Sequence, residues 1–432
     1  MNYSETIDYL FTRLPMFSRM GSAAFKKDLT NTIVLCEALG NPHRKFKSIH
    51  VGGTNGKGSV SHMLAAVLQT AGYKTGLYTS PHLYDFRERI RINGDLVSED
   101  FVVSFVERIR PLIEKVSPSF FEITVAMAFD YFASQEVDIS IVEVGLGGRL
   151  DSTNIITPEL SVITNIGLDH TNMLGTTLQE IAGEKAGIIK KGVPVVIGEK
   201  HPETEPVFTE KAHKENAPLY FAEDHYEVTR FSFSNDSLAI EVNDRDAHTE
   251  AVYQLDLPGV YQEKNIKTVL QAIRLLKKQG WVLTEEHTHA ALSSVKKLTG
   301  LHGRWEIIHR HPDIVLEVAH NEDGVRQMVR HLEDLSYQQL HIVYGMVKDK
   351  EAGPVLALLP KEATYYFTQA HIPRALSAGE LSQKAETYGL QGKTYEDVNK
   401  ALQAAKASAS GDDLVLVCGS IFLVAEVDKG RV

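Results

Sequence analysis

The sequence contains little cysteine and no long apolar run. Only Cys36 and Cys418 occur among its 432 residues, which is too few for a disulfide framework and fits a reducing compartment. The first residues lack the basic and apolar segments of a signal peptide. The most apolar late stretch, residues 414–427, is interrupted by Gly419 and Ser420 and is too short to span a bilayer. We therefore expect a soluble, cytoplasmic, monomeric protein with no membrane partner.

Positive charge is also in the minority. Lysine and arginine number 45 against 56 aspartates and glutamates, so the formal net charge is −11. A surface of this sign repels a phosphate backbone, and nucleic acid is not expected as a partner. Small anions are not excluded, because a phosphate site needs only a local arrangement of N–H groups and one or two cations.

Short β-branched runs alternate with amphipathic stretches, a pattern typical of α/β layers. Strands are predicted at residues 48–51, 74–78, 139–144, 160–164, 194–198, 314–318, 340–345, 364–367 and 414–418. Helices are predicted at residues 60–71, 99–115, 121–134, 178–190 and 263–278. Residues 226–257 alternate as a small antiparallel sheet does, and glycines near residue 300 break the helical pattern. The sequence thus predicts a larger domain at 1–298 and a smaller α/β domain at 299–432.

A glycine-rich loop follows the first predicted strand. Strand 48–51 runs into Gly52-Gly53-Thr54-Asn55-Gly56-Lys57-Gly58-Ser59 and then into a helix. Glycines let backbone N–H groups turn inward, the helix N-terminus adds its dipole, and Lys57 supplies a charge. The loop is not a regular Walker A motif, because Val51 replaces the first glycine and Gly58 separates Lys57 from Ser59. It nevertheless predicts nucleotide binding rather than a turn without a ligand.

A second glycine-rich segment has a different interpretation from the first. Residues 145–150 read Gly-Leu-Gly-Gly-Arg-Leu and begin like a dinucleotide fingerprint. Leu150 stands where the third glycine should be, and residues 151–154 look like a loop rather than a helix. A dinucleotide site is therefore not expected here.

Three further segments carry candidate site residues. Glu143 ends an apolar strand before a glycine turn, where P-loop proteins place an acid that holds Mg²⁺. Residues 165–170 follow the next strand and bring an aspartate and His170 to the same edge of the sheet. Lys185 lies in an apolar helical stretch, where a neutral amine could react with carbon dioxide to give a carbamate. A salt bridge from Lys185 to Glu184 or Glu180 is the simpler alternative.

Other segments complete a set of motifs that spans most of the chain. They are Thr79-Ser80-Pro81-His82-Leu83, Phe86-Arg87-Glu88-Arg89-Ile90, Phe121-Glu122, residues 143–151, Leu168-Asp169-His170, residues 184–190, Gly303-Arg304 and Ala319-His320-Asn321. With the phosphate loop, they make the chain closely resemble the folylpolyglutamate synthase/dihydrofolate synthase branch of the Mur ligase family. The resemblance implies a P-loop ATPase domain, with a mostly parallel sheet and a small antiparallel one, and a smaller C-terminal Rossmann-like domain.

The resemblance also implies roles for single residues. ATP would contact Thr54, Asn55, Gly56, Lys57, Gly58, Ser59, Asn265, Arg304 and Glu317. One Mg²⁺ would be held by Ser80 and Glu143, and a second by His170 and a carbamylated Lys185. The pterin substrate would contact Ser119, Phe120, Phe121, Glu122, Leu150, Asp151 and Ser152, and His320 would also contact substrate. Lys57, His170 and Lys185 are the implied catalytic residues.

Four positions depart from the common family pattern. The family usually has Asp where Glu317 stands, often has Pro where Glu322 stands, and frequently has His at the position of Tyr261, before Gln262. Thr is frequent where Ser119 begins the pterin segment. The last difference leaves the exact pterin substrate open.

The implied activity is ATP-dependent addition of L-glutamate to reduced folates and to dihydropteroate through an acyl phosphate. The attacking carboxylate and the γ-phosphate are both anionic, so two Mg²⁺ and Lys57 would screen their repulsion. An enzyme with one of the two folate activities, or another Mur-type amide ligase, is the nearest alternative. A nucleotide switch is disfavoured because the sequence has no Asn-Lys-x-Asp motif. A P-loop kinase would need neither the Lys185 segment nor a second Rossmann-like domain.

Overall fold

Eight strands form the larger sheet of the protein, in the order β4-β3-β2-β5-β1-β6-β7-β8. Their bounds are β1 Lys47–Gly52, β2 Thr75–Tyr78, β3 Ile90–Ile92, β4 Asp95–Leu96, β5 Ile139–Glu143, β6 Leu160–Ile163, β7 Val195–Ile197 and β8 Leu219–Phe221. The strands from β2 to β8 in this order run parallel, and β3 and β4 form an antiparallel edge. The central strands β2, β5, β1 and β6 are buried almost throughout, as their continuous apolar runs predict.

The structure is a computed structural model that describes residues 1–21, 28–234 and 236–431. The chain divides into two units. Unit 1 comprises Met1–Asp256 and Gln262–Leu301, and unit 2 comprises Leu257–Tyr261 and His302–Val432. The short segment Leu257–Tyr261 therefore belongs to unit 2, although the helix that begins at Gln262 belongs to unit 1.

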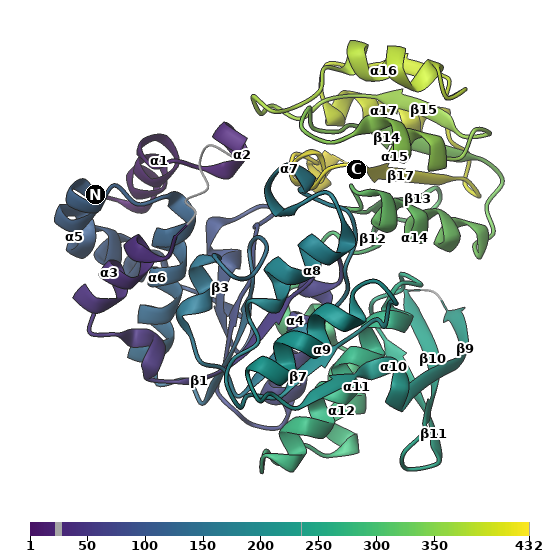
Figure 1. The fold of residues 1–432 in the computed structure, drawn as a ribbon. Helices are drawn as coiled ribbons and strands as arrows, with labels where there is room; N and C mark the ends of the chain where they lie inside the picture. The colour runs from purple at the N-terminus through teal and green to yellow at the C-terminus, as the bar shows by residue number, and fades with distance from the viewer. Residues whose placement is uncertain (22–27, 235, 432) are drawn as a thin grey trace. The chain divides into compact units, whose positions relative to one another are not determined.

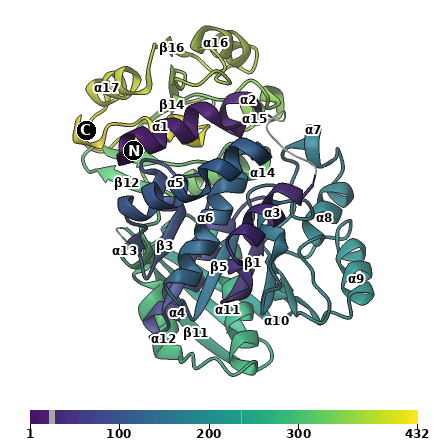
Figure 2. The ribbon, with the colours of Figure 1, turned by 90° about the vertical axis from the view of Figure 1, so that its left-hand side faces the viewer.

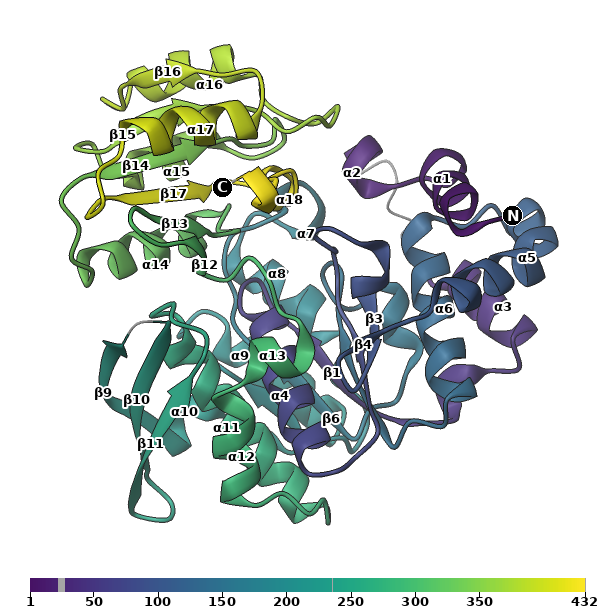
Figure 3. The same cartoon turned by 180° about the vertical axis from the view of Figure 1, so that it is seen from behind.

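Helices cover both faces of the larger sheet (Figure 1). One group, turned toward the viewer in Figure 2, consists of α1 Tyr3–Arg13, α3 Thr30–Ala38, α5 Glu99–Val116 and α6 Phe120–Ser134. Figure 3 shows the opposite side, with α4 Lys57–Thr70, α11 Gln262–Lys278, α12 Glu285–Leu292 and α13 Val295–Thr299. The other helices of this unit are α2 Phe17–Met20, α7 Thr171–Leu174, α8 Leu178–Ala186, α9 Glu205–Lys214 and α10 Ala222–His225. An apolar core joins α1, α3, α5 and α6 to Tyr78 and Val142 of the sheet.

A three-stranded antiparallel sheet completes unit 1. It consists of β9 Tyr226–Ser234, β10 Ser237–Asp244 and β11 Thr249–Leu255, in the order β11-β10-β9. Leu238, Ile240 and Val242 alternate along β10 and are buried, so one face of this sheet packs on the protein. This is the small sheet that the alternating pattern at 226–257 predicts.

Unit 2 is built on a six-stranded sheet in the order β12-β13-β17-β14-β15-β16. Its strands are β12 Glu306–His309, β13 Asp313–Leu316, β14 Leu340–Tyr344, β15 Thr364–Phe367, β16 Gly392–Thr394 and β17 Leu414–Cys418. All pair in parallel except β12. Its helices are α14 Glu322–Glu333, α15 Ala352–Leu358, α16 Ala378–Glu386, α17 Val398–Ser408 and α18 Ile421–Ala425. The arrangement confirms the predicted α/β architecture of the C-terminal part.

Two predicted strands have the observed bounds, and the other predicted strands and helices differ by one to three residues at one or both ends, except for one helix that differs by more. Strands 364–367 and 414–418 are confirmed as predicted. The helix predicted at 178–190 is wrong at its end, since α8 stops at Ala186 and Gly187 packs against the backbone of Arg149. A Cβ at Gly187 would lie 2.3 Å from the Arg149 Cα. Residues 152–155, expected as a loop, form a 3₁₀ turn. Within the described residues, no helix is both long and apolar enough to cross a membrane.

Candidate active site

The loops that follow β2, β5, β1 and β6 carry most of the predicted site residues of unit 1. These four strands are neighbours in the sheet and run parallel, so their carboxyl ends lie along one edge. Open α/β sheets bind their ligands at this edge. The order of the strands therefore brings together segments that are up to 113 residues apart in the sequence.

The phosphate loop needs glycine at two of its positions. Gly53 has φ 142° and Gly56 has φ 81°, conformations that L side chains rarely adopt. A Cβ on Gly53 would lie 1.9 Å from Oγ1 of Thr164, and one on Gly56 would lie 2.3 Å from Oδ1 of Asn265. Helix α4 begins directly after Gly56, so its first N–H groups are available at the loop.

The segment after β6 holds this loop in place. The Thr54 N–H donates to the Asn165 carbonyl, and the Asn55 N–H donates to Oδ1 of Asn165. The Thr54 hydroxyl donates to the Gly167 carbonyl and accepts from the Gly167 N–H. Sequence reasoning did not single out Asn165 for this role, although its place directly after a central strand was a signal.

Two lysines lie at the loop. Nζ of Lys57 donates to the carbonyl oxygens of Gly53 (3.1 Å) and Thr54 (3.0 Å). Nζ of Lys185 donates to the same Gly53 oxygen, at 2.9 Å. Lys185 is buried, with 4% of its surface exposed, and burial together with the charge of Lys57 holds its pKa well below the ordinary value. Lys185 is thus the lysine that favours the neutral amine.

The alternative salt bridge of Lys185 is not formed. Glu184 pairs with Arg149, with 2.7 Å between Oε1 and Nη2. Glu180 caps its own helix and accepts hydrogen bonds from the N–H groups of Thr176 and Thr177. Within the described residues, Lys185 has no ion pair with a carboxylate.

Glu143 and Ser80 lie together at the ends of neighbouring strands. The Ser80 N–H donates to Oε2 of Glu143 at 3.1 Å, and Glu143 is 4% exposed. The buried Glu143 carboxylate offers the hard oxygen ligands that Mg²⁺ prefers, and its bond to the Ser80 N–H brings Ser80 to the same place. The described part of the chain holds no cluster of three or more His, Cys, Asp and Glu side chains placed to bind a metal.

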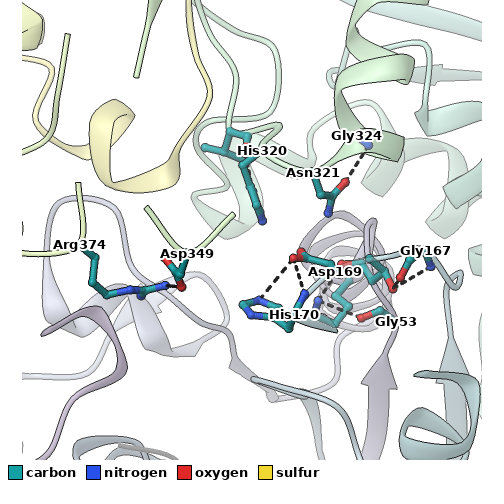
Figure 4. A network of polar contacts seen from close by, with 12 residues as sticks. Gly53, Gly167, Asp169, His170, His320, Asn321, Gly324, Asp349 and Arg374 are labelled. Atoms are coloured by element: carbon teal, nitrogen blue, oxygen red, sulfur yellow. Dashed lines mark hydrogen bonds and ion pairs between the residues drawn. The ribbon is translucent and has the colours of Figure 1, made fainter. Parts of the chain in front are cut away.

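His170 begins helix α7 with a left-handed backbone, φ 51°. Its N–H donates to Oδ1 of Asp169 at 2.7 Å, and its ring Nε2 lies 3.9 Å from the same oxygen (Figure 4). The ring is about one quarter exposed, whereas the Asp169 side chain is 8% exposed. The carboxylate thus orients a histidine that solvent or a ligand can still reach.

The segment predicted to bind a pterin has structural roles as well. Ser119 and Glu122 form a capping box at the start of α6, and both are buried. Phe120 is buried, and its ring lies against the rings of Phe11 and Phe86. Phe121 is partly exposed, and its ring lies 2.4 Å from the place where Gly145 would carry a Cβ. Of these four residues, Phe121 has the only partly exposed side chain in the structure, and the pterin contacts of the segment stay a prediction.

Asp151 lies at one end of a series of buried hydrogen bonds. It accepts hydrogen bonds from the N–H groups of Leu146 and Thr153 and from the Thr153 hydroxyl, which also contacts Nε2 of His50. Burial raises the pKa of Asp151, and these hydrogen bonds oppose the shift. Asp151 caps the following 3₁₀ turn, and its partly exposed neighbours Leu150 and Ser152 face a ligand more readily.

A link that sequence reasoning missed joins α11 to the phosphate loop. Nε2 of Gln262 donates to the Ser59 hydroxyl at 3.2 Å, and Oε1 of Gln262 accepts from Nδ2 of Asn265 at 2.7 Å. Gln262 is fully buried, and Asn265 is 7% exposed. The predicted ATP contact at Asn265 is thus part of a relay that ends on Ser59.

In unit 2, the predicted nucleotide carboxylate is Glu317, at the end of β13. Its oxygens accept from the Tyr261 hydroxyl and from the N–H groups of Trp305 and Ala319, and the charge of Arg304 favours its ionised form. Burial raises the pKa of Glu317 against these effects.

Two more features of unit 2 are visible in Figure 4. Asn321 caps helix α14 by accepting the Gly324 N–H, and the ring of the neighbouring His320 contacts the Val318 carbonyl. Asp349, which follows β14, pairs with Arg374, which follows β15. Charged side chains therefore line the carboxyl edge of this sheet too.

Comparisons with known proteins agree with this geometry. The family model of the Mur ligase middle domain matches residues 51–273, and that of the Mur ligase, glutamate ligase domain matches residues 303–421. A dihydrofolate synthase/folylpolyglutamate synthase of Bacillus subtilis is 32% identical over 99% of this chain and 98% of its own length. A probable bifunctional folylpolyglutamate synthase/dihydropteroate synthase of Haloferax volcanii is 33% identical over 99% of this chain, which spans 50% of that relative. The structure of E. coli FolC in complex with DHPP and ADP has a TM-score of 0.84 and 31% identity, covering 98% and 96% of the two chains.

The phosphate loop, its lysine and the strand-end carboxylate define an ATP-dependent ligase once these matches are added. The chain belongs to the Mur ligase family, in its folylpolyglutamate synthase/dihydrofolate synthase branch. The resemblance and the fold class that the sequence predicts are both confirmed.

Proposed function

We propose that the protein couples ATP hydrolysis to the addition of L-glutamate to reduced folates and to dihydropteroate. The observation that carries this proposal is the phosphate loop with Lys57 and Lys185 on one carbonyl, in a chain whose relatives are named for both folate activities. Both cysteines are buried free thiols, which supports a reducing compartment such as the cytoplasm.

The residues present fit a nucleotide and a divalent cation. Gly53 and Gly56 leave space where a side chain would clash, and the first N–H groups of α4 suit a phosphate. Ser80 and Glu143 would hold one Mg²⁺, and His170 with Lys185 a second. The ions would supply positive charge that screens the substrate carboxylate from the γ-phosphate.

Lys57 supplies the protein's own positive charge to this step. A carboxylate oxygen of the folate attacks the γ-phosphorus, the bond between that phosphorus and ADP breaks, and an acyl phosphate results. In this structure Lys57 donates to carbonyl oxygens of its own loop, so it is already directed into the loop rather than toward solvent. Charge fixed in place before the reaction stabilises the transferring phosphoryl group at no reorganisation cost.

The second step joins the glutamate. Its neutral amino nitrogen attacks the acyl carbon and the C–N bond forms. The bond to phosphate breaks, phosphate leaves with the electron pair, and the nitrogen loses one proton, which phosphate or solvent takes up. Unprotected acyl phosphate would be hydrolysed, so water must be excluded while glutamate binds. The partly exposed Phe121, Leu150 and Ser152 are the side chains that we assign to the pterin end of the acceptor, and His320 to substrate in unit 2.

Lys185 carries a separate part of the proposal. Its neutral amine can add carbon dioxide, forming an N–C bond and losing one proton, which gives a carbamate. The carbamate places anionic oxygens where a cation would repel Mg²⁺. The burial of Lys185 and its freedom from carboxylate partners within the described residues support this modification.

Glutamate-dependent phosphate release tests the function. Purified protein with Mg²⁺, ATP and glutamate is assayed with dihydropteroate and, separately, with a reduced folate, and the amide product is measured by mass spectrometry. Turnover with both acceptors is expected. Turnover with reduced folate alone would establish a single-activity folylpolyglutamate synthase, and no turnover with either would refute the folate-ligase proposal.

A further inference from the structure

Tyr261 and Glu317 form a side-chain hydrogen bond within unit 2. The Tyr261 hydroxyl donates to Oε2 of Glu317 at 2.7 Å. These are two of the positions that depart from the common family pattern, with Tyr in place of the frequent His and Glu in place of the usual Asp. The side chains at these two positions are thus in direct contact in this structure.

The hydrogen bonds of Glu317 can be counted. Oε2 accepts from Tyr261 and from the Trp305 N–H at 2.9 Å, and Oε1 accepts from the Ala319 N–H at 3.1 Å. A carboxylate has about four acceptor sites. One site, on Oε1, therefore remains for a donor from outside, and a nucleotide hydroxyl is such a donor.

The Tyr261 ring packs closely against Gly259. A Cβ on Gly259 would lie 2.5 Å from Cζ of the ring and 2.8 Å from its hydroxyl oxygen. Gly259 does not have a positive φ, so glycine is needed there for space and not for backbone conformation. Partial burial and the charge of Glu317 raise the pKa of Tyr261 well above its ordinary value, which keeps the phenol a donor.

The next residue is anchored in the other unit. Tyr261 is the last residue of Leu257–Tyr261, which belongs to unit 2, whereas Gln262 opens α11 of unit 1. Gln262 donates to Ser59 of the phosphate loop. Tyr261 thus forms a hydrogen bond with Glu317 in unit 2, and the next residue, Gln262, forms one with Ser59 in unit 1.

We propose that Tyr261 is a positioning residue for nucleotide binding, which orients the Glu317 carboxylate through their hydrogen bond. The proposal rests on the proposed function and takes Glu317 as the nucleotide contact that the family resemblance implies. It goes further in naming the residue that sets this carboxylate.

Tyr261→Phe tests the proposal because it removes only the hydroxyl. The full-length chain is titrated with a fluorescent ATP analogue, and steady-state KM and kcat are measured for ATP and for glutamate. We expect the analogue Kd and the KM for ATP to rise about tenfold, the scale of a hydrogen bond to a charged group. The kcat and the KM for glutamate should change little. Tyr253→Phe is the matched control, since Tyr253 also donates to a glutamate, Glu285, in a different part of the chain.

A double-mutant cycle separates positioning from a merely structural role. Glu317→Asp alone should weaken nucleotide binding because the shorter carboxylate cannot reach its donors. Adding Tyr261→Phe to Glu317→Asp should cost less than Tyr261→Phe costs in the wild-type chain, because the hydrogen bond is already weakened. If Tyr261→Phe unfolds, Tyr261→His with and without Glu317→Asp gives the same comparison.

Any of three results would overturn the proposal. The first is a Tyr261→Phe protein with unchanged Kd and KM for nucleotide. The second is independent effects of the Tyr261 and Glu317 changes, and the third is a wild-type chain that does not bind the analogue. A wild-type chain that binds the analogue but joins no glutamate would refute the proposed function alone, because the binding cycle would still report on Tyr261.

Discussion

Lys57 and Lys185 donate to one acceptor, the carbonyl oxygen of Gly53, at 3.1 and 2.9 Å. Two ammonium groups so placed repel each other, and the more buried one loses its proton first. Lys185 is the more buried, so its amine is the better nucleophile toward carbon dioxide, while we assign Lys57 to the phosphates. The two lysines share one acceptor, but because they differ in burial we assign them different roles.

The first prediction concerns Lys185. Lys185→Ala should lose most activity, because the carbamate ligand of the second Mg²⁺ is removed, and short carboxylic acids should partly restore it by filling the vacated position. Lys185→Arg should not be rescued, since Arg keeps the charge and fills the space. A ¹³C NMR signal for a carbamate, in wild-type protein equilibrated with ¹³C-labelled bicarbonate but not in Lys185→Ala, would show the modification directly. A wild-type chain without that signal, at full activity, contradicts the role.

The second prediction concerns Lys57. Lys57→Ala should lower kcat by roughly two to three orders of magnitude, corresponding to about 2.7–4 kcal/mol for a preorganised electrostatic donor. Carboxylic acids should not restore this activity, because an anion cannot replace a cation. Lys47→Ala is the matched control, since Lys47 lies on the strand that leads to the loop and its side chain is 57% exposed. A Lys57→Ala enzyme with the turnover of the control would show that the loop is not catalytic.

The sequence predicts the loop and the strands around it well, because both depend on local patterns. The run from Gly52 to Ser59 and the apolar strands are recognisable without a structure. The bonds of Asn165 to the loop and of Gln262 to Ser59 are not, because they join residues 110 and 203 positions apart. Such contacts depend on how strands are ordered in the sheet, which periodicity does not specify.

The predicted pterin segment shows a second limit of prediction from sequence. Ser119, Glu122 and Asp151 are polar residues within motifs, and a sequence cannot separate a polar group that binds a ligand from one that caps a helix. In the structure all three are buried and begin a helix or a 3₁₀ turn. Phe121, Leu150 and Ser152 of the same segments are partly exposed, so a ligand can reach them directly.

The third prediction tests the loop backbone. Gly53→Ala should abolish ATP binding, since the new Cβ would meet Thr164 at 1.9 Å and φ 142° is strained for any L side chain. Gly183→Ala is the matched control, because a Cβ there meets nothing within 4 Å and Ala is favoured over Gly inside helix α8 by about 1 kcal/mol. Nucleotide titration and thermal melts of both variants give the comparison. Normal ATP binding by Gly53→Ala would mean that the loop adopts another conformation.

The last prediction concerns stability and pH in unit 2, at Glu306. Burial alone would raise the pKa of this carboxyl, but hydrogen bonds from His302, Lys429 and the Gly303 N–H outweigh it and lower the pKa to about 2. A lowered pKa in the folded state means that the carboxylate stabilises the fold above its unfolded pKa, near 4.5, and that this contribution disappears as the pH falls toward 2.

The ionised Glu306 carboxylate contributes on the order of 3 kcal/mol to the free energy of unfolding at neutral pH, as the shift of its pKa implies. Glu306→Gln should therefore lower the free energy of unfolding at pH 7 by up to that amount, and the gap to wild type should narrow steadily between about pH 4.5 and 2. Urea unfolding at several pH values measures this difference in the free energy of unfolding. The effects of the other carboxyl groups cancel in the difference, because both proteins contain them. Glu386→Gln, at an exposed position of α16, should show little change at any pH. A gap for Glu306→Gln that stays constant as the pH falls would mean that its loss comes from packing and not from the ionised carboxylate.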